Sequence, residues 1–178
     1  MKKALSVLIV LALLLSLVSC ALAEDLVFTR RNFYGGQTLP VYRGPGHEYG
    51  RGANGYAKAY TDEPLYAAGK ENGWALVMYE TGNGSVRVGY VDLSQFHYNT
   101  GILKLEPLDF SYASVKITQA CTLTDDPVLY NRDLATLPEG LTVTYLGSFY
   151  KYRSWAYIET WVDGHPIRGF VPMDCTSR

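Results

Sequence analysis

One pattern occurs twice in this chain, and it limits what the chain can fold into. Each copy has an apolar strand end, a proline turn, a Trp that opens a hairpin, and a closing Gly-aromatic-Val. The first copy runs from Val41 to Asp92 and the second from Leu123 to Pro172. Repetition at this spacing predicts two small units of one fold rather than a single large domain.

Both copies contain strand signals and no helix signal. The runs 74–80 and 155–162 are rich in β-branched and aromatic residues, which strands favour. Asn83-Gly84 and Asp163-Gly164 follow these runs, and both pairs suit the type I′ turn of a tight hairpin. No segment after the N-terminal stretch keeps a period of 3.6 residues with caps. The sequence therefore predicts an all-β chain.

Each copy is small for an independent core, and a sheet curled on itself removes exposed edges at that size. We therefore expect two tandem small barrels, at residues 24–95 and 115–178. Residues 96–114 would connect them. This connection contains Leu105, Leu108 and Phe110 with a single proline, Pro107, so it is too apolar for a free linker. It should pack between the barrels.

The N-terminus has the features of an export signal. Lys2 and Lys3 precede an apolar stretch at 4–18, and Ala21-Leu22-Ala23 offers small residues for cleavage. Residues 1–23 therefore read as a signal peptide, and the mature protein as secreted or on a bacterial surface. Two alternatives remain open. Leu17-Val18-Ser19-Cys20 fits a lipobox with a lipid on Cys20, and residues 4–23 are barely long enough for a retained membrane anchor.

Charge and cysteine content restrict the partners and the redox chemistry. Without Lys2 and Lys3, the 16 basic residues fall to 14 against 17 acidic ones. That balance disfavours nucleic acid and anionic membranes, so membrane contact is expected only if Cys20 is lipidated. Once Cys20 is removed or lipidated, Cys121 and Cys175 remain. An even count in an exported chain predicts one disulfide, with two free buried thiols as the alternative.

Catalytic and metal-binding patterns are missing from the sequence. His47, His97 and His165 stand alone, without the spacing that zinc sites use. Asp125-Asp126 lacks the alternating ligands of a calcium loop and reads as a turn cap. Cys121 has no evident activating base. We therefore expect no enzyme activity, no metal and no cofactor.

Several short motifs resemble those of the bacterial SH3 (SH3b) family. These are "LPVYRGPGHEY", "ENGW" and "VGYVD" in the first copy. The second copy is divergent, because Asp125-Asp126-Pro127 stands where Gly-Pro-Gly would be. The matching positions are Val41, Gly44, Pro45, Gly46, Tyr49, Gly73, Trp74, Gly89, Tyr90 and Val91.

The resemblance implies SH3-like barrels and a binding role at the cell envelope. Members of the family often bind cell-wall peptides or glycans. The function expected here is an exported, non-catalytic module for peptidoglycan peptide or glycan. The alternative is a structural or protein-interaction unit that docks to another surface protein.

The candidate ligand-binding residues lie around the Gly-Pro-Gly loop. Tyr42 and Tyr49 offer faces for stacking, Arg43 could pair with a carboxylate, and His47 lies between them. Strand alternation after the core residue Val41 would turn Tyr42 towards solvent. Whether this loop presents a surface or caps the core is left open by the sequence.

Overall fold

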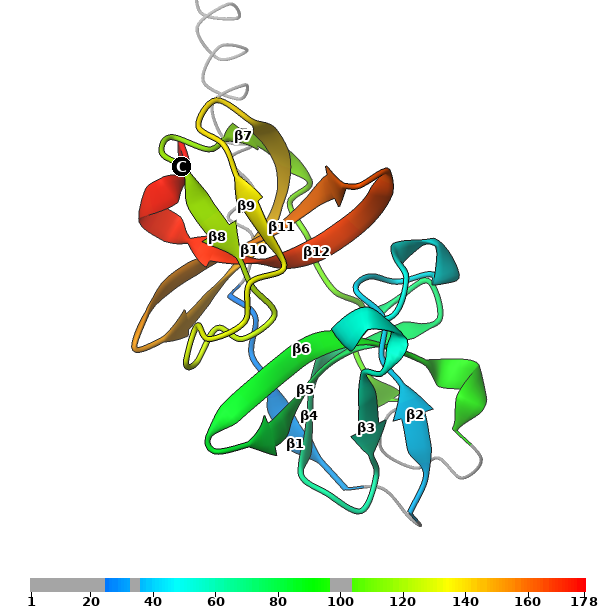
Figure 1. Cartoon of the computed structure of the whole chain (residues 1–178). Coiled ribbons are helices and arrows are strands. Elements are labelled where there is room, and N and C mark those ends of the chain that lie inside the picture. The colour runs from blue at the N-terminus through cyan, green and yellow to red at the C-terminus, as the bar shows by residue number, and fades with distance from the viewer. Residues whose placement is uncertain (1–24, 33–35, 97–103) are drawn as a thin grey trace, which may run out of the picture.

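A computed structural model describes residues 25–32, 36–96 and 104–178 of the chain. The predicted signal peptide and Cys20 lie outside the described residues. Strands and short 3₁₀ turns make up the regular structure of the described part (Figure 1). Across these three ranges, no helix has the length and apolar character needed to cross a membrane.

The first unit consists of a four-stranded antiparallel sheet and a two-stranded one. The larger sheet has the order β1-β4-β5-β6, and β2 pairs with β3. The strands are β1 (Thr29–Arg31), β2 (Thr38–Pro40), β3 (Lys58–Tyr60), β4 (Leu65–Glu71), β5 (Trp74–Gly82) and β6 (Ser85–Asp92).

The second unit repeats this arrangement. Its larger sheet has the order β7-β10-β11-β12, and β8 pairs with β9. The strands are β7 (Ala113–Lys116), β8 (Cys121–Leu123), β9 (Ala135–Leu137), β10 (Thr142–Lys151), β11 (Arg153–Val162) and β12 (His165–Pro172). The prediction of an all-β chain built from two similar units is confirmed.

The equivalence of the two units extends to single residues. A bulge interrupts β4 between Ala67 and Gly69, and another interrupts β10 between Tyr145 and Gly147. Two residues after each bulge, Glu71 pairs with Trp74 in the first unit and Phe149 pairs with Trp155 in the second. Positions in one unit can therefore be matched to positions in the other by their pairing alone.

The Gly-aromatic-Val motif is a crossing point of two backbones. Tyr42 forms a bridge with Tyr90, and Thr124 forms the matching bridge with Phe170. A Cβ on Gly89 would lie 2.7 Å from the carbonyl oxygen of Tyr42. A glycine is needed there because the loop strand passes directly over it.

Three apolar clusters form the interior, one inside each unit and one between the units. In β11, Ala156 and Ile158 face the core of the second unit, whereas Trp155 and Tyr157 belong to the cluster between the units. In β5, Ala75 and Val77 face the first unit's core, and Trp74 and Leu76 face the shared cluster. Because both strands are buried on both faces, their sequences are almost continuously apolar.

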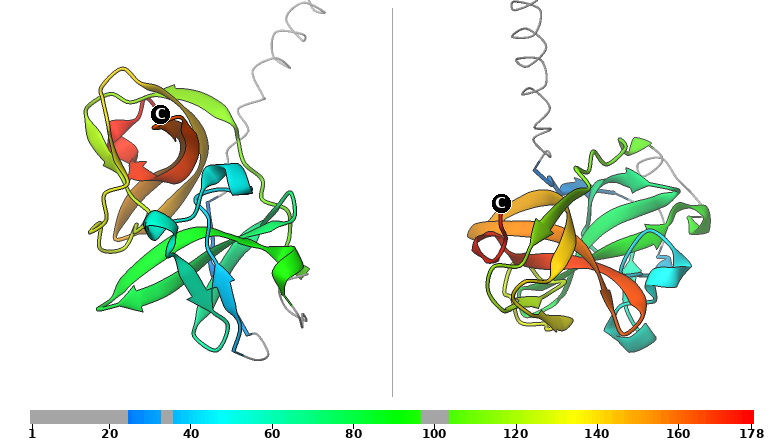
Figure 2. Two further views of the ribbon diagram at one scale, coloured as in Figure 1. Left: turned by 45° about the vertical axis from the view of Figure 1, so that its right-hand side comes forward. Right: turned by 90° about the horizontal axis from the view of Figure 1, so that it is seen from above.

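The units also exchange the segments that lead into their first strands (Figure 2). The amide of Leu26, just before β1 of the first unit, donates to the carbonyl of Ser148 in the second unit at 2.7 Å. The amide of Leu108, before β7 of the second unit, donates to the carbonyl of Lys70 in the first at 2.9 Å. The described part of the connection is thus packed against β4.

Candidate functional site

The Gly-Pro-Gly loop lies against the second unit and does not stand free in solvent. The carbonyl of Arg43 accepts a hydrogen bond from the amide of Arg168 in β12 at 2.9 Å. Gly44, Pro45 and Gly46 are all buried. A Cβ on Gly44 would collide with the ring of Tyr49, so glycine allows the loop to fold back on itself.

Tyr42 and His47 pack on Trp74. The ring centroids of Tyr42 and Trp74 are 5.0 Å apart, and those of His47 and Trp74 are 5.1 Å apart, in edge-to-face arrangements. Tyr42 does lie on the face opposite Val41, as alternation predicts, but it is not turned to solvent. That face is covered because β5 carries Trp74 there, in the cluster between the units.

Tyr49 joins an ionic cluster that links both units. Its hydroxyl donates to the carboxylate of Glu159 at 2.7 Å. Arg168, with a side chain only 3% exposed, pairs with Glu71 at 2.6 Å and with Glu159 at 2.7 Å. Burial and the hydrogen bond to Glu159 raise the pKa of Tyr49 well above its ordinary value. Glu71 belongs to the first unit, so Arg168 fixes the units to each other.

A second polar cluster lies at the equivalent loop of the second copy. Asp125 accepts from the guanidinium of Arg87 at 2.7 Å and from that of Arg132 at 2.8 Å. The carboxylate of Asp126 caps the turn, because it accepts hydrogen bonds from the amides of Val128 and Leu129 at 3.0 Å. The predicted turn cap is present, and Asp125 also links this loop to the first unit through Arg87.

Two of the four predicted residues reach an open groove. We call it the His47 groove; its volume is about 590 Å³. The loop of the first unit forms one wall, and the β11–β12 hairpin of the second unit forms the other. The lining residues are His47, Glu48, Tyr49, Gly50, Glu159, Trp161, Gly164, His165 and Pro166.

Trp161 is the most prominent of the groove residues that sequence reasoning missed. Its side chain is 69% exposed. It follows Trp155, Tyr157 and Glu159 in the alternation of β11, so it continues the strand face that contacts the first unit. The sequence did offer one signal, a Trp on the same strand face as Trp155. Only the packing of the two units against each other, however, places Trp161 opposite His47.

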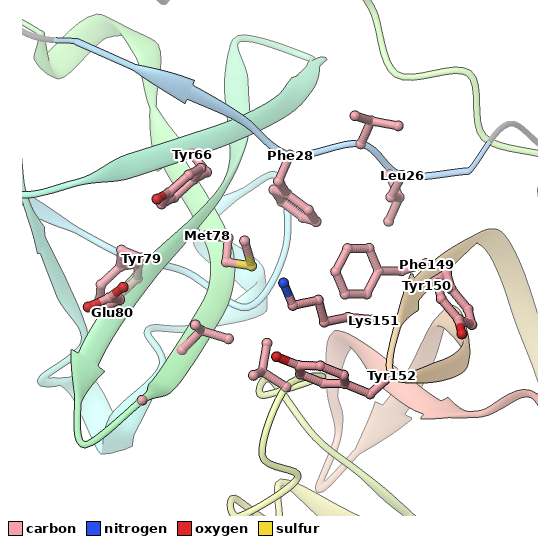
Figure 3. Close-up of a pocket in the computed structure, with 14 residues that line it drawn as sticks. Leu26, Phe28, Tyr66, Met78, Tyr79, Glu80, Phe149, Tyr150, Lys151 and Tyr152 are labelled. Atoms are coloured by element: carbon pink, nitrogen blue, oxygen red, sulfur yellow. The ribbon is translucent and has the colours of Figure 1, made fainter.

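A second groove lies on the other side of the boundary between the units. We call it the Phe149 groove; its volume is about 500 Å³ (Figure 3). Its walls come from the lead-in segment at 26–28, from β4 to β6 and from the end of β10. The lining residues are Leu26, Val27, Phe28, Tyr66, Met78, Tyr79, Glu80, Gly84, Val86, Val128, Phe149, Tyr150, Lys151 and Tyr152.

Cys121 and Cys175 are free thiols in the structure, so the bridge predicted from the sequence is not formed in it. The fold nevertheless brings the two side chains together. Burial, with the neighbouring Cys175 thiol, raises the pKa of Cys121 to about 12. Packing places the sulfur atoms, but joining them requires an oxidation that packing does not perform.

The described residues contain no cluster of three His, Cys, Asp or Glu side chains that could hold a metal ion. The polar clusters around Arg168 and Asp125 are internally paired. What the two grooves offer chemically is aromatic surface and a few hydrogen-bonding groups, which suits binding.

Comparison with solved structures finds a distant likeness. No protein-family model matches the sequence, and no curated protein matches it. A solved structure described as NlpC2 from Trichomonas vaginalis aligns with a TM-score of 0.32 and 16% sequence identity. The alignment covers 87% of this chain and 49% of that one, so the chain spans about half of that protein's length.

Proposed function

We propose that this protein is an exported, non-catalytic module that binds cell-envelope material, a peptidoglycan glycan or peptide, in the His47 groove. The observation that carries the proposal is the exposed ring of Trp161 on the wall opposite the His47–Tyr49 turn. A large apolar ring left in water beside a concave surface is a typical contact for a flat ligand face.

The groove combines that ring with polar groups of mixed type. His47, Glu48 and His165 are exposed at its edge. Such groups can donate to and accept from sugar hydroxyls or peptide amides, while the ring covers the apolar face of a sugar. This composition supports a saccharide or a short peptide better than a lipid.

The groove is also preorganised. Tyr49 is fixed by its hydrogen bond to Glu159, and Arg43 is fixed by its main-chain bond to Arg168. A ligand would therefore not have to order the loop on binding, which saves conformational entropy. The resemblance of the first copy to SH3b motifs and the predicted signal peptide support a ligand outside the cell.

The test is sedimentation of the purified protein with bacterial peptidoglycan sacculi, followed by titration with soluble muropeptides. We expect Trp161→Ala to weaken binding about five- to tenfold, since stacking on one aromatic ring contributes about 1–1.5 kcal/mol. Its melting temperature should stay unchanged, because the side chain is largely exposed.

The matched control is Tyr56→Ala. Tyr56 is 81% exposed and lies on the first unit, away from the His47 groove. Its removal should leave binding unchanged. Binding by Trp161→Ala equal to that of the unsubstituted protein would remove the site from this groove.

A further inference from the structure

The ionic cluster beside the His47 groove and two apolar residues that line the Phe149 groove occupy equivalent places in the two units. Glu71 pairs with Trp74 across β4 and β5, and Phe149 pairs with Trp155 across β10 and β11. Trp74 and Trp155 are themselves equivalent, so Phe149 stands where the other unit has Glu71.

The other two residues of the ionic cluster, Arg168 and Glu159, also have apolar counterparts in the first unit. Met78 pairs with Val88 across β5 and β6, and Glu159 pairs with Arg168 across β11 and β12. Glu71, Arg168 and Glu159 on one side of the boundary thus correspond to Phe149, Val88 and Met78 on the other. One side carries two carboxylates and a guanidinium, and the other carries three apolar side chains.

The loop of the first copy brings an aromatic side chain to the ionic cluster, and the loop of the second copy brings none to the Phe149 groove. On the ionic side, Tyr49 reaches from the first unit's loop, and the guanidinium of Arg168 lies 5.5 Å from the centre of its ring. On the apolar side, the loop of the second copy contributes only Val128 to the Phe149 groove, which Met78 and Phe149 line and Val88 does not. Met78 and Phe149 thus line an open groove, whereas Glu159, the counterpart of Met78, accepts a hydrogen bond from the aromatic side chain of Tyr49.

We propose that the Phe149 groove binds a segment of another protein that inserts a large apolar side chain, best an aromatic one, next to a carboxylate. Met78 replaces the hydrogen-bond acceptor Glu159, so an inserted Phe suits the floor better than a Tyr. A thioether beside a ring edge adds a favourable contact, and Phe149 offers a second ring.

Lys151 supplies the charge that selects the carboxylate. Figure 3 shows its amine directed into the groove, towards Met78. Tyr150 and Tyr152 flank it and are 70% and 79% exposed. Glu80 lies on the opposite wall (Figure 3), so a segment bound in the reverse direction would set its carboxylate against another one.

The test uses a peptide that copies the loop bearing Tyr49, acetyl-Gly-His-Glu-Phe-Gly-amide. Here Phe replaces Tyr49 of the chain's own Gly46–Gly50. Titration of the full mature protein, followed by amide NMR shifts, should show weak saturable binding with shifts confined to the groove. Replacing Phe by Ala in the peptide should abolish the shifts. Replacing Glu by Lys should weaken binding at least about fivefold, because a charge-assisted contact is lost.

Variants of the protein separate this site from alternatives. Lys151→Met and Tyr152→Ser, both at exposed positions, should each weaken peptide binding about three- to tenfold without a change in melting temperature. Lys116→Met removes an exposed lysine of β7 that does not line the groove, and it should bind as the unsubstituted protein does. Trp161→Ala should also retain peptide binding, which keeps this result independent of the His47 groove.

A double variant, Met78→Glu with Val88→Arg, rebuilds part of the ion pair of the other side and should close the groove to the peptide. The proposal is overturned if the peptide binds equally well to Lys151→Met and Tyr152→Ser. It is also overturned if anionic phospholipid vesicles or sacculi, and not the peptide, cause the shifts in the groove.

Discussion

The main chains of Arg43 and Arg168 are joined by a hydrogen bond of 2.9 Å that crosses the boundary between the two units. Val88 and Asp125 form a second such bond, also of 2.9 Å, with the roles of the units exchanged. Arg43 and Asp125 hold equivalent places in the two copies, as do Val88 and Arg168. The interface is therefore self-complementary in the way of a twofold dimer, although one chain makes both halves.

Arg168→Met should destabilise the protein by about 3 kcal/mol, because it leaves Glu71 and Glu159 largely buried without a cation. Urea denaturation measures the difference. Arg153→Met is the control, since its pair with Asp174 is solvent-exposed and should contribute less than about 1 kcal/mol. Equal losses in the two variants would show that Arg168 does not hold the units together.

Gly89→Ala should cost about 1–3 kcal/mol, as overpacking of a close backbone contact does. The added methyl would lie 2.5 Å from Val41 and 2.7 Å from the carbonyl of Tyr42. Gly169→Ala, at the equivalent crossing over Thr124, should behave alike. Gly36→Ala meets only ordinary contact at 3.4 Å and should be nearly neutral in thermal denaturation. Neutral behaviour at Gly89 would mean that the two backbones separate easily.

Stability should fall as the pH rises from about 10 to 12. Burial raises the pKa of Tyr79 to about 12, and burial also raises that of Tyr90 well above its ordinary value near 10. A tyrosine whose pKa is raised in the folded state ionises first in the unfolded state, and this favours unfolding. The stability that it contributes is therefore complete below about pH 10 and is lost progressively between about pH 10 and 12.

Urea titrations at pH 9, 10 and 11, with phenolate absorbance, test this dependence. Tyr79→Phe should reduce the decline, and Tyr56→Phe, at an exposed position, should not. Full phenolate absorbance near pH 10 in a protein that is still folded would contradict the expectation.

Cys121 and Cys175 should be bridged in protein that is exported and purified without reductant. The two thiols already interact in the fold, and a loop of this length gains about 4 kcal/mol from closure. Thiol titration after denaturation should then find no free thiol. In reduced protein, Cys121 should react slowly with alkylating agents while folded, because its pKa is raised. Two titratable thiols in the unreduced protein would refute the bridge.

Much of the fold could be predicted because its signals are local. Asn83-Gly84 and Asp163-Gly164 are each the turn of a hairpin, with Asn83, Gly84, Asp163 and Gly164 all at positive φ. The Trp-led runs are strands. Leu108 and Phe110 pack in the cluster between the units as expected, whereas Leu105 belongs to the core of the first unit. Turn chemistry and β propensity act within a few residues, so a sequence read from end to end reveals them.

The site was only partly predictable, and Tyr42 and Trp161 show why. Alternation from Val41 placed Tyr42 on the correct face, but alternation does not say what covers that face. Trp161 continues the alternation of Trp155 and Tyr157, yet it is exposed where they are buried. A strand pattern specifies two faces, and only the packing of the second unit decides which part of a face is interior and which is groove.

Local patterns were enough to predict two all-β units, their hairpins and the closing Gly-aromatic-Val motif of each copy, because these follow from backbone geometry and local propensity. The packing of the two units was needed to show that Gly-Pro-Gly is an interface loop, that the lead-in segments are exchanged, and that equivalent positions form an ion cluster at Arg168 and an open groove at Phe149. The reason is physical: burial and charge pairing depend on residues about 80 to 100 positions apart, such as Glu71 and Arg168, whose meeting no local pattern encodes.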